Sequence, residues 1–258
     1  MTLNYAVKRA GVVIAQLGVV VLVIWLWGVL SGHDILDPVY FSSPSQVWHE
    51  LKDWYADGSL WHNLGDTMRV FAIGYVAGTV LGIVIGVLIG AVGWLRELTE
   101  PFLAFFNAMP RLILLPLLVV WFGFGVLPKV VLVMAVIVLM VALNVASGLR
   151  EVRSDLLDSA KLKGAGTLAL LQHVYIPSVA LWVTSTARVT VGYAFNAAIA
   201  AEFIGANTGL GYLMYLSQSN FQPEGIWAAL ILTVVVAIVM DGLLALVEHR
   251  ATRWMPVS

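Results

Sequence analysis

Charged and amide side chains inside long apolar segments are the residues of this sequence whose types and positions could do chemistry. Arg111, Arg188, Asn196, Glu202 and Asp241 all lie within such segments. An isolated charge in hydrocarbon is costly, so by default it faces a bundle interior or an aqueous path. We therefore expect Arg111, Arg188, Asn196 and Glu202 to line a path for a polar solute.

The same residues allow other interpretations. Each arginine could tie neighbouring helices together instead of facing a pore. Glu202 and Asp241 could form the proton relay of an ion-coupled carrier. Glu202 is near the outer end of its segment and Asp241 is about two turns from the opposite end, so a structural pair or cap is the stronger interpretation of the two acids.

The sequence contains no motif for catalysis or for metal binding. Walker A, GxSxG and HExxH patterns are absent, and the chain has no cysteine. The histidines have no ligand spacing; they are His33, His49, His62, His173 and His249. We expect no catalytic site, no metal and no cofactor in this chain, so active transport would take its energy from a partner subunit.

Composition places these residues in a polytopic, all-α membrane protein. The chain has 258 residues, of which 60% are hydrophobic and 11% charged, with a net charge of -1. Several apolar runs approach the roughly 20 residues that a helix needs to cross a bilayer. Six transmembrane helices are predicted, the first a retained span and not a signal peptide: 10–30, 70–92, 101–122, 127–147, 178–204 and 226–247.

Two of the predicted spans have special features. The second carries a glycine at every fourth position, which leaves a smooth groove for close helix packing: Gly74, Gly78, Gly82, Gly86 and Gly90. The third contains Asn107, Pro110, Arg111 and Pro116, so it should be bent or partly unwound.

A polar insert, 155–177, separates the fourth and fifth predicted spans. Ser154 can cap a first short helix, Gly164-Ala165-Gly166 breaks it, and Thr167 can cap a second. Two short helices at a bend predict a segment that contacts a soluble partner.

Lysine and arginine are concentrated on one side of the predicted spans. The positive-inside bias puts both termini and the insert in the cytoplasm. The residues on that side are Lys8, Arg9, Arg96, Arg150, Arg153, Lys161, Lys163, Arg250 and Arg253, against Lys52 and Lys129 on the other.

The spacing within the insert resembles a family signature. Asp158-Ser159-Ala160 is followed by three residues, Gly164, nine residues, and Val174-Tyr175-Ile176-Pro177. This resembles the EAA signature of permeases of binding-protein-dependent ABC importers, which reads Glu-Ala-Ala, three residues, Gly, nine residues, Ile, any residue, Leu-Pro. Asp158 stands for Glu, Ser159 for Ala, Val174 for Ile and Ile176 for Leu, while Gly164 and Pro177 match outright.

Two further segments, 109–125 and 200–215, look like those of the subfamily that imports nitrate, bicarbonate, taurine and alkanesulfonates. The resemblance implies a type I importer permease in the bacterial inner membrane, with a first helix and interfacial segment in 1–65, a core domain in 66–258 and a coupling loop in 150–177. It also implies two cytoplasmic ATP-binding subunits, an extracytoplasmic solute-binding protein and a second copy of the chain. A small anion is the expected solute, because a guanidinium can hold an oxyanion by two hydrogen bonds.

Overall fold

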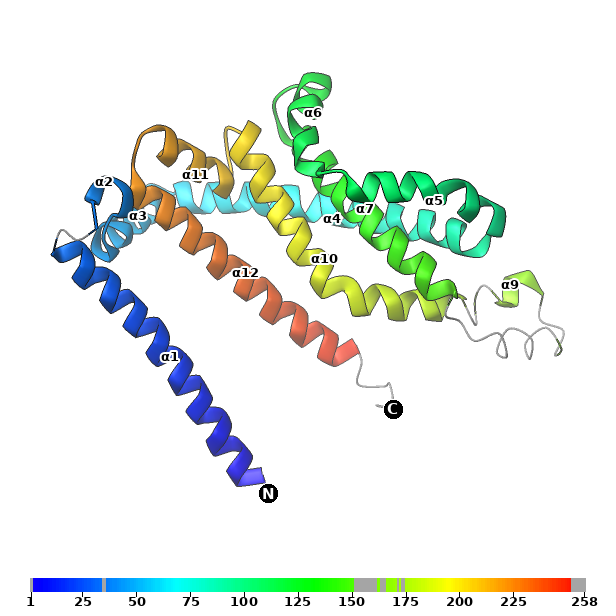
Figure 1. Ribbon diagram of the computed structural model, residues 1–258, viewed down its shortest axis with the longest axis horizontal. Helices are drawn as coiled ribbons and strands as arrows, with labels where there is room; N and C mark the ends of the chain where they lie inside the picture. Colours follow the sequence, from blue (N-terminus) through cyan, green and yellow to red (C-terminus); the bar gives the residue numbers. More distant parts are fainter. Residues whose placement is uncertain are drawn as a thin grey trace. The chain divides into compact units, whose positions relative to one another are not determined.

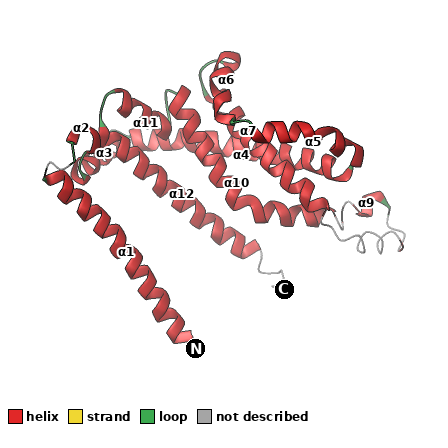
Figure 2. Ribbon diagram, in the orientation of Figure 1, coloured by secondary structure: helices red, strands yellow, loops and turns green. Residues whose placement is uncertain are grey.

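The computed structural model describes residues 2–33, 36–150, 162, 166–170, 172 and 175–251. Within these ranges every regular element is a helix (Figure 2). In chain order they are α1 (Thr2–Gly32), α2 (Pro38–Phe41), α3 (Pro44–Ala56), α4 (Ser59–Ala91), α5 (Gly93–Ala108), the 3-10 helix η1 (Arg111–Leu114), α6 (Leu115–Phe122), α7 (Val126–Arg150), α9 (Thr167–Leu170), α10 (Ile176–Gly205), α11 (Leu210–Ser219) and α12 (Pro223–Ala251).

Within the described part of the chain, five helical segments are long and apolar enough to cross a membrane, and a bent pair makes a sixth when it is counted as one span. The pair joins Gly93–Ala108 to Arg111–Phe122 through an angle of 87° (Figure 1). Pro110 has no N–H, and it disfavours the α conformation at Met109, whose ψ is 128°. The predicted six spans and the predicted break in the third are therefore confirmed.

The helix α4 is longer than expected. It begins at Ser59, whereas the sequence suggested a span starting near residue 70. This first part of the helix carries the polar side chains of Asn63 and Thr67. The structure buries both side chains in hydrogen bonds to other segments, so the helix continues through these polar positions.

The described chain falls into two compact units. One comprises residues 1–61 and 213–232, and the other comprises 62–212 and 233–258. The sequence placed a boundary near residue 65 but did not assign 213–232 to the N-terminal part. That assignment requires contacts between segments far apart in the chain, such as the ring contact of Trp27 with Trp227 at 5.3 Å between centroids.

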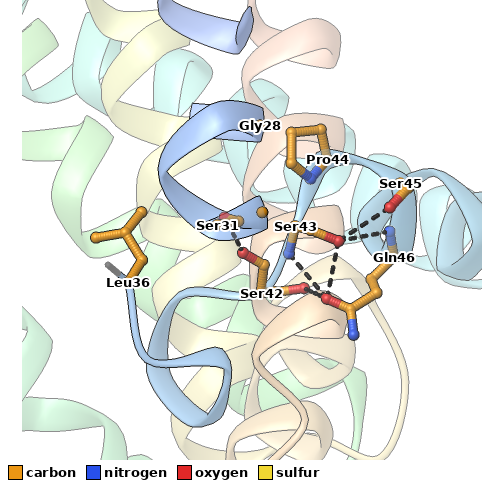
Figure 3. A pocket seen from close by; sticks show the side chains of 9 residues that line it. Gly28, Ser31, Leu36, Ser42, Ser43, Pro44, Ser45 and Gln46 are labelled. Carbon is orange, nitrogen blue, oxygen red and sulfur yellow. Dashed lines mark hydrogen bonds between the residues drawn. The ribbon is translucent and has the colours of Figure 1, made fainter. Parts of the chain in front are cut away.

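In the first unit, hydrogen bonds fix the entry to α3. Ser43 caps the helix, and its backbone N–H donates to Gln46 Oε1 at 2.9 Å. Ser31 Oγ donates to the carbonyl oxygen of Ser42 at 2.8 Å, which ties the end of α1 to the same corner (Figure 3). This serine-rich corner borders a cavity of about 620 Å³.

The same unit changes the expectation for α3. The sequence predicted an interfacial helix over 45–55 that carries Val47, Trp48, Leu51 and Trp54. Val47 and Trp54 are buried inside the unit, whereas Trp48 is exposed. Partial burial also raises the pKa of Glu50, and the carboxylates of Glu224 and Asp53 add to that rise.

In the second unit, the glycines of α4 pack along α7. A Cβ at Gly74 would lie 2.6 Å from Val133 Cβ, and a Cβ at Gly82 would lie 2.7 Å from Val141 Cβ. Gly78, Gly86 and Gly90 meet α7 in the same way. Because real Cβ atoms do not approach so closely, the two helices could not pack at this separation with larger residues.

The core of this unit lies between α7 and α10. From α7 it takes large branched side chains such as Val133 and Ile137, and from α10 it takes Ala194, Ala197 and Ala198. The alanines allow α10 to approach α7 closely, since small residues reduce the distance between helix axes. This packing fixes the elements that carry the candidate site.

Candidate solute pathway and coupling loop

Most of the predicted coupling loop lies outside the described residues. Asp158, Ser159, Ala160, Gly164 and Val174 belong to that part. Ile176 is exposed and begins α10, and Pro177 follows in its first turn, where a missing N–H costs no helical hydrogen bond. The short helix α9 begins at Thr167, the residue that the sequence suggested as the cap of the insert's second helix.

The two helices that carry this loop are packed together at its base. Gly148 lies in the last turns of α7, and a Cβ there would collide with the indole ring of Trp182 in α10. Arg150 ends α7, and its Nε donates to the carbonyl oxygen of Ala146 at 3.1 Å. A displacement of the loop would therefore act on α7 and α10 as one packed pair.

Arg111 lies at the bend between α5 and α6. The chain is extended at Met109 and Pro110, and η1 then turns back toward the end of α5. One terminal nitrogen of Arg111 donates to Asn107 Oδ1 at 3.1 Å. The break in the helix thus places a guanidinium and an amide side by side.

A cavity of about 300 Å³ adjoins this pair. The bend contributes one wall, and α7 and α10 contribute the others. Lining residues include Asn107, Arg111, Leu112, Val136, Tyr193 and Asn196. All the polar groups named here could contact a bound solute.

Two of the four predicted path residues, Arg111 and Asn196, share this cavity. The sequence did not indicate Asn107 or Tyr193 as path residues. A signal was present for both: Asn107 lies four positions before Arg111 in the same apolar segment, and Tyr193 precedes Asn196 by three residues on the same face of a helix.

Arg188 has a different environment. Its Nε donates to Asp241 Oδ1 and a terminal nitrogen donates to Oδ2, both at 2.5 Å. The sequence showed no carboxylate close to Arg188, because Asp241 lies on α12, far along the chain. The ion pair joins α10 to α12, so Arg188 ties two helices together, which is one of the two interpretations given for the arginines. Because Asp241 is paired with Arg188, it does not form the proposed proton relay with Glu202.

Glu202 is fully buried and does not line the cavity beside Arg111. Thr67 Oγ1 donates to its Oε2 at 2.8 Å, and the backbone N–H of Gly211 donates to the same oxygen at 3.2 Å. Lys129, also buried, supplies the positive charge that acts on this carboxylate. The contacts are those of a tie between helices, not of a group facing solvent.

The turn after α10 is built around this carboxylate. Gly209 has a φ of +115°, and a Cβ there would collide with the carboxyl group of Glu202. The backbone N–H groups of Gly209 and Leu210 donate to Asn63 Oδ1 at 2.7 Å and to Thr67 Oγ1 at 2.9 Å. The glycine-rich turn is thereby fixed to α4.

Long apolar helices, a span broken at Pro110 and a polar cavity at that break define a transmembrane transport subunit. Residues 78–253 match the family described as the binding-protein-dependent transport system inner membrane component, and the chain belongs to this family. The comparison confirms an ABC importer permease as predicted and does not favour the ion-coupled carrier.

Curated relatives match over nearly the whole chain. The taurine transport system permease protein TauC of Escherichia coli (strain K12) is 24% identical over 244 residues, covering 93% of this chain and 89% of its own length. The putative aliphatic sulfonates transport permease protein SsuC of the same organism is 30% identical over 234 residues, covering 91% and 89%. The riboflavin transport system permease protein RibX of Chloroflexus aurantiacus is 30% identical over 234 residues, covering 90% and 86%.

The fold is also similar to a solved structure. An inward-facing crystal structure of the MetNI methionine ABC transporter contains a chain with a TM-score of 0.66 and 20% identity. The match covers 78% of this chain and 97% of that chain. It supports the type I importer fold.

Proposed function

We propose that this permease forms the path of an ATP-driven importer for a small oxyanion of the sulfonate, nitrate, bicarbonate or carboxylate type. The observation that carries the proposal is the cavity where Arg111 and Asn196 meet at the broken span. TauC and SsuC are named for taurine and aliphatic sulfonates, which carry a sulfonate group, and this supports the same class of solute.

The donors around the cavity suit an oxyanion. Arg111 carries a positive charge and five N–H donors. Because Asn107 accepts from Arg111 through its carbonyl oxygen, its NH₂ group remains available to donate. Asn196 and Tyr193 can add further donors from α10, so several hydrogen bonds could converge on one anion.

The proposed assembly contains two copies of this chain, two cytoplasmic ATP-binding subunits and an extracytoplasmic solute-binding protein. The ATP-binding subunits, which hold ATP and magnesium, would grip the loop 155–177. ATP-driven closure would move that loop and, through the contact of Gly148 with Trp182, the packed ends of α7 and α10. Both termini would lie in the cytoplasm, as the distribution of lysine and arginine indicates.

Uptake into vesicles that contain the assembled transporter tests the solute path. The solutes are taurine, an alkanesulfonate, nitrate and bicarbonate, with riboflavin as a neutral comparison. We expect at least one small anion to be transported, and Arg111→Gln to lower that uptake about tenfold, since one charge-assisted hydrogen bond accounts for a change of that size.

Arg69→Gln is the matched control, because Arg69 is exposed on α4 and does not line the cavity. Uptake is normalised to the amount of inserted complex. Transport of riboflavin alone would overturn the anion assignment. Equal uptake by wild type and Arg111→Gln would remove Arg111 from the path.

A further inference from the structure

Helix α5 has two chemically different faces. One face is apolar and exposed and carries Trp94, Leu98, Phe102 and Phe105. The other carries Arg96, Glu100, Ala104 and Asn107, at spacings of four, four and three residues. Positions three and four apart lie on one side of a helix, so Arg96, Glu100 and Asn107 form a polar stripe along α5 that also includes the small residue at position 104.

This polar stripe borders a second cavity, of about 220 Å³. Helix α7 supplies the facing wall, including Arg150 and Ala146, and Ile89 of α4 contributes at one side. Asn107 lines both this cavity and the one beside Arg111, so the two cavities meet at a single side chain. Along α5, Arg96 and Asn107 are about 16 Å apart at 1.5 Å per residue.

Among the described residues that line the second cavity, the charged groups are two guanidiniums and one carboxylate. None of the described carboxylates forms an ion pair with Arg96 or Arg150. Arg150 uses its Nε to bind the carbonyl oxygen of Ala146, which leaves both terminal nitrogens for another acceptor. The cavity therefore has a positive charge excess and unused donors.

We propose that Arg96 and Arg150 form a second oxyanion site, joined through Asn107 to the cavity of Arg111. An anion would pass from the bend along the polar face of α5 toward the end of α7. Two sites of moderate affinity suit transport, because conduction requires binding that is strong enough to admit an ion and weak enough to release it. Glu100 limits the attraction at the second site. The identity of the anion as the transported solute rests on the proposed function.

The site can be tested without knowing the solute. The chain has no cysteine, so Ala104→Cys introduces a single thiol into the polar stripe. Membrane fragments containing the full transporter, open on both faces, are treated with 2-sulfonatoethyl methanethiosulfonate or its cationic trimethylammonium analogue. Mass spectrometry of the permease gives the labelled fraction over time, and hence the reaction rate with each reagent. With either reagent, the thiolate attacks the methanethiosulfonate, a disulfide forms and methanesulfinate leaves. The ratio of the two rates therefore cancels any change in thiol pKa and reports the local charge.

Four further substitutions, each combined with Ala104→Cys, test the sign of that charge. Arg96→Gln and Arg150→Gln should each lower the anionic-to-cationic rate ratio by roughly threefold to fivefold, whereas Arg150→Lys should preserve it. Glu100→Gln should raise it. Leu98→Cys, on the apolar face of the same helix, should react slowly with both reagents.

An unreactive thiol at position 104, or a ratio that none of these substitutions changes, would overturn the second site. Labelling requires no turnover, so this outcome is distinct from failure of the proposed function. If the ratios respond as expected and only riboflavin is taken up, the anion assignment fails while the anion-selective site remains.

Discussion

Arg188 of α10 and Asp241 of α12 form an ion pair through two parallel hydrogen bonds, and both side chains are half exposed, at 50% and 51%. Each residue lies within an apolar helix. In such surroundings a partner of opposite charge is the usual way to tolerate an ionised side chain. The pair therefore joins α12 to the core helix α10.

Breaking this pair should impair transport by loosening α12. Arg188→Gln and Asp241→Asn should each lower uptake several-fold, and Arg188→Gln should do more harm than Arg69→Gln. The double exchange, Arg188→Asp with Asp241→Arg, should recover much of the loss because it restores opposite charges. Uptake normalised to inserted complex is the measurement. A double exchange no better than either single reversal would contradict the pairing.

The glycine groove predicts opposite effects of the same substitution at two positions of α4. Gly82→Ala should destabilise the permease by about 1–3 kcal/mol, because the new Cβ would lie 2.7 Å from Val141 Cβ and 2.9 Å from a backbone oxygen of α7. Gly65→Ala should be neutral or stabilising by up to about 1 kcal/mol, since a Cβ added at Gly65 would meet no other atom within 4 Å. Thermal unfolding of the purified complex measures both. Equal melting temperatures would show that the groove tolerates a side chain.

The buried carboxylate of Glu202 predicts a graded series. Glu202→Gln keeps an acceptor for Thr67 and Gly211 and should be the milder change. Glu202→Ala removes the acceptor of the buried Gly211 N–H and should cost about 1–3 kcal/mol, while Thr67 Oγ1 keeps the carbonyl oxygen of Asn63 as an acceptor. Gly209→Ala should resemble Glu202→Ala, because its φ of +115° and its contact with Glu202 both exclude a side chain. A Gly209→Ala protein with the stability of wild type would contradict this account of the turn.

The coupling loop can be tested by two substitutions that leave the spans unchanged. Gly164→Val should prevent the backbone from bending at residue 164 or from packing closely there against a partner. Asp158→Lys reverses the charge at the start of the predicted helix. We expect both variants to be inserted yet inactive in uptake, with weaker association of the ATP-binding subunits in co-purification. Gly166→Ala is the matched control, since a Cβ added at Gly166 would meet no other atom within 4 Å. Normal uptake and normal association in both variants would remove the docking role.

Single cysteines test the orientation of the chain. With an impermeant thiol reagent applied to intact cells, Ser59→Cys and Asn207→Cys should be labelled, whereas Lys163→Cys should react only after the membrane is opened. The expectation follows from the bias of lysine and arginine toward one side. Labelling of Lys163→Cys from outside intact cells would reverse the proposed topology.

The sequence by itself determined the properties that depend on neighbouring residues. Apolar runs of sufficient length fixed the class and the six spans, and Pro110 fixed the place where the third span breaks. The glycines repeat at a helical period, so their common face was readable without any partner helix. Which helix fills that groove was not readable, because the glycine pattern is complementary to many branched faces.

Tertiary structure decided the contacts between residues far apart in the chain. Asp241 and Arg188 are separated by 53 positions, and Thr67 and Glu202 by 135, so no local spacing indicates either pair. The sequence assigned Arg188 and Glu202 to the same path as Arg111 because all three are polar groups inside apolar segments. Packing separated them: Arg188 is bound by Asp241, Glu202 is enclosed by a glycine turn, and only Arg111 of the three borders the cavity with Asn196. The cost of an unpaired polar group in hydrocarbon is local and could be anticipated, but the partner that offsets it depends on how the helices pack.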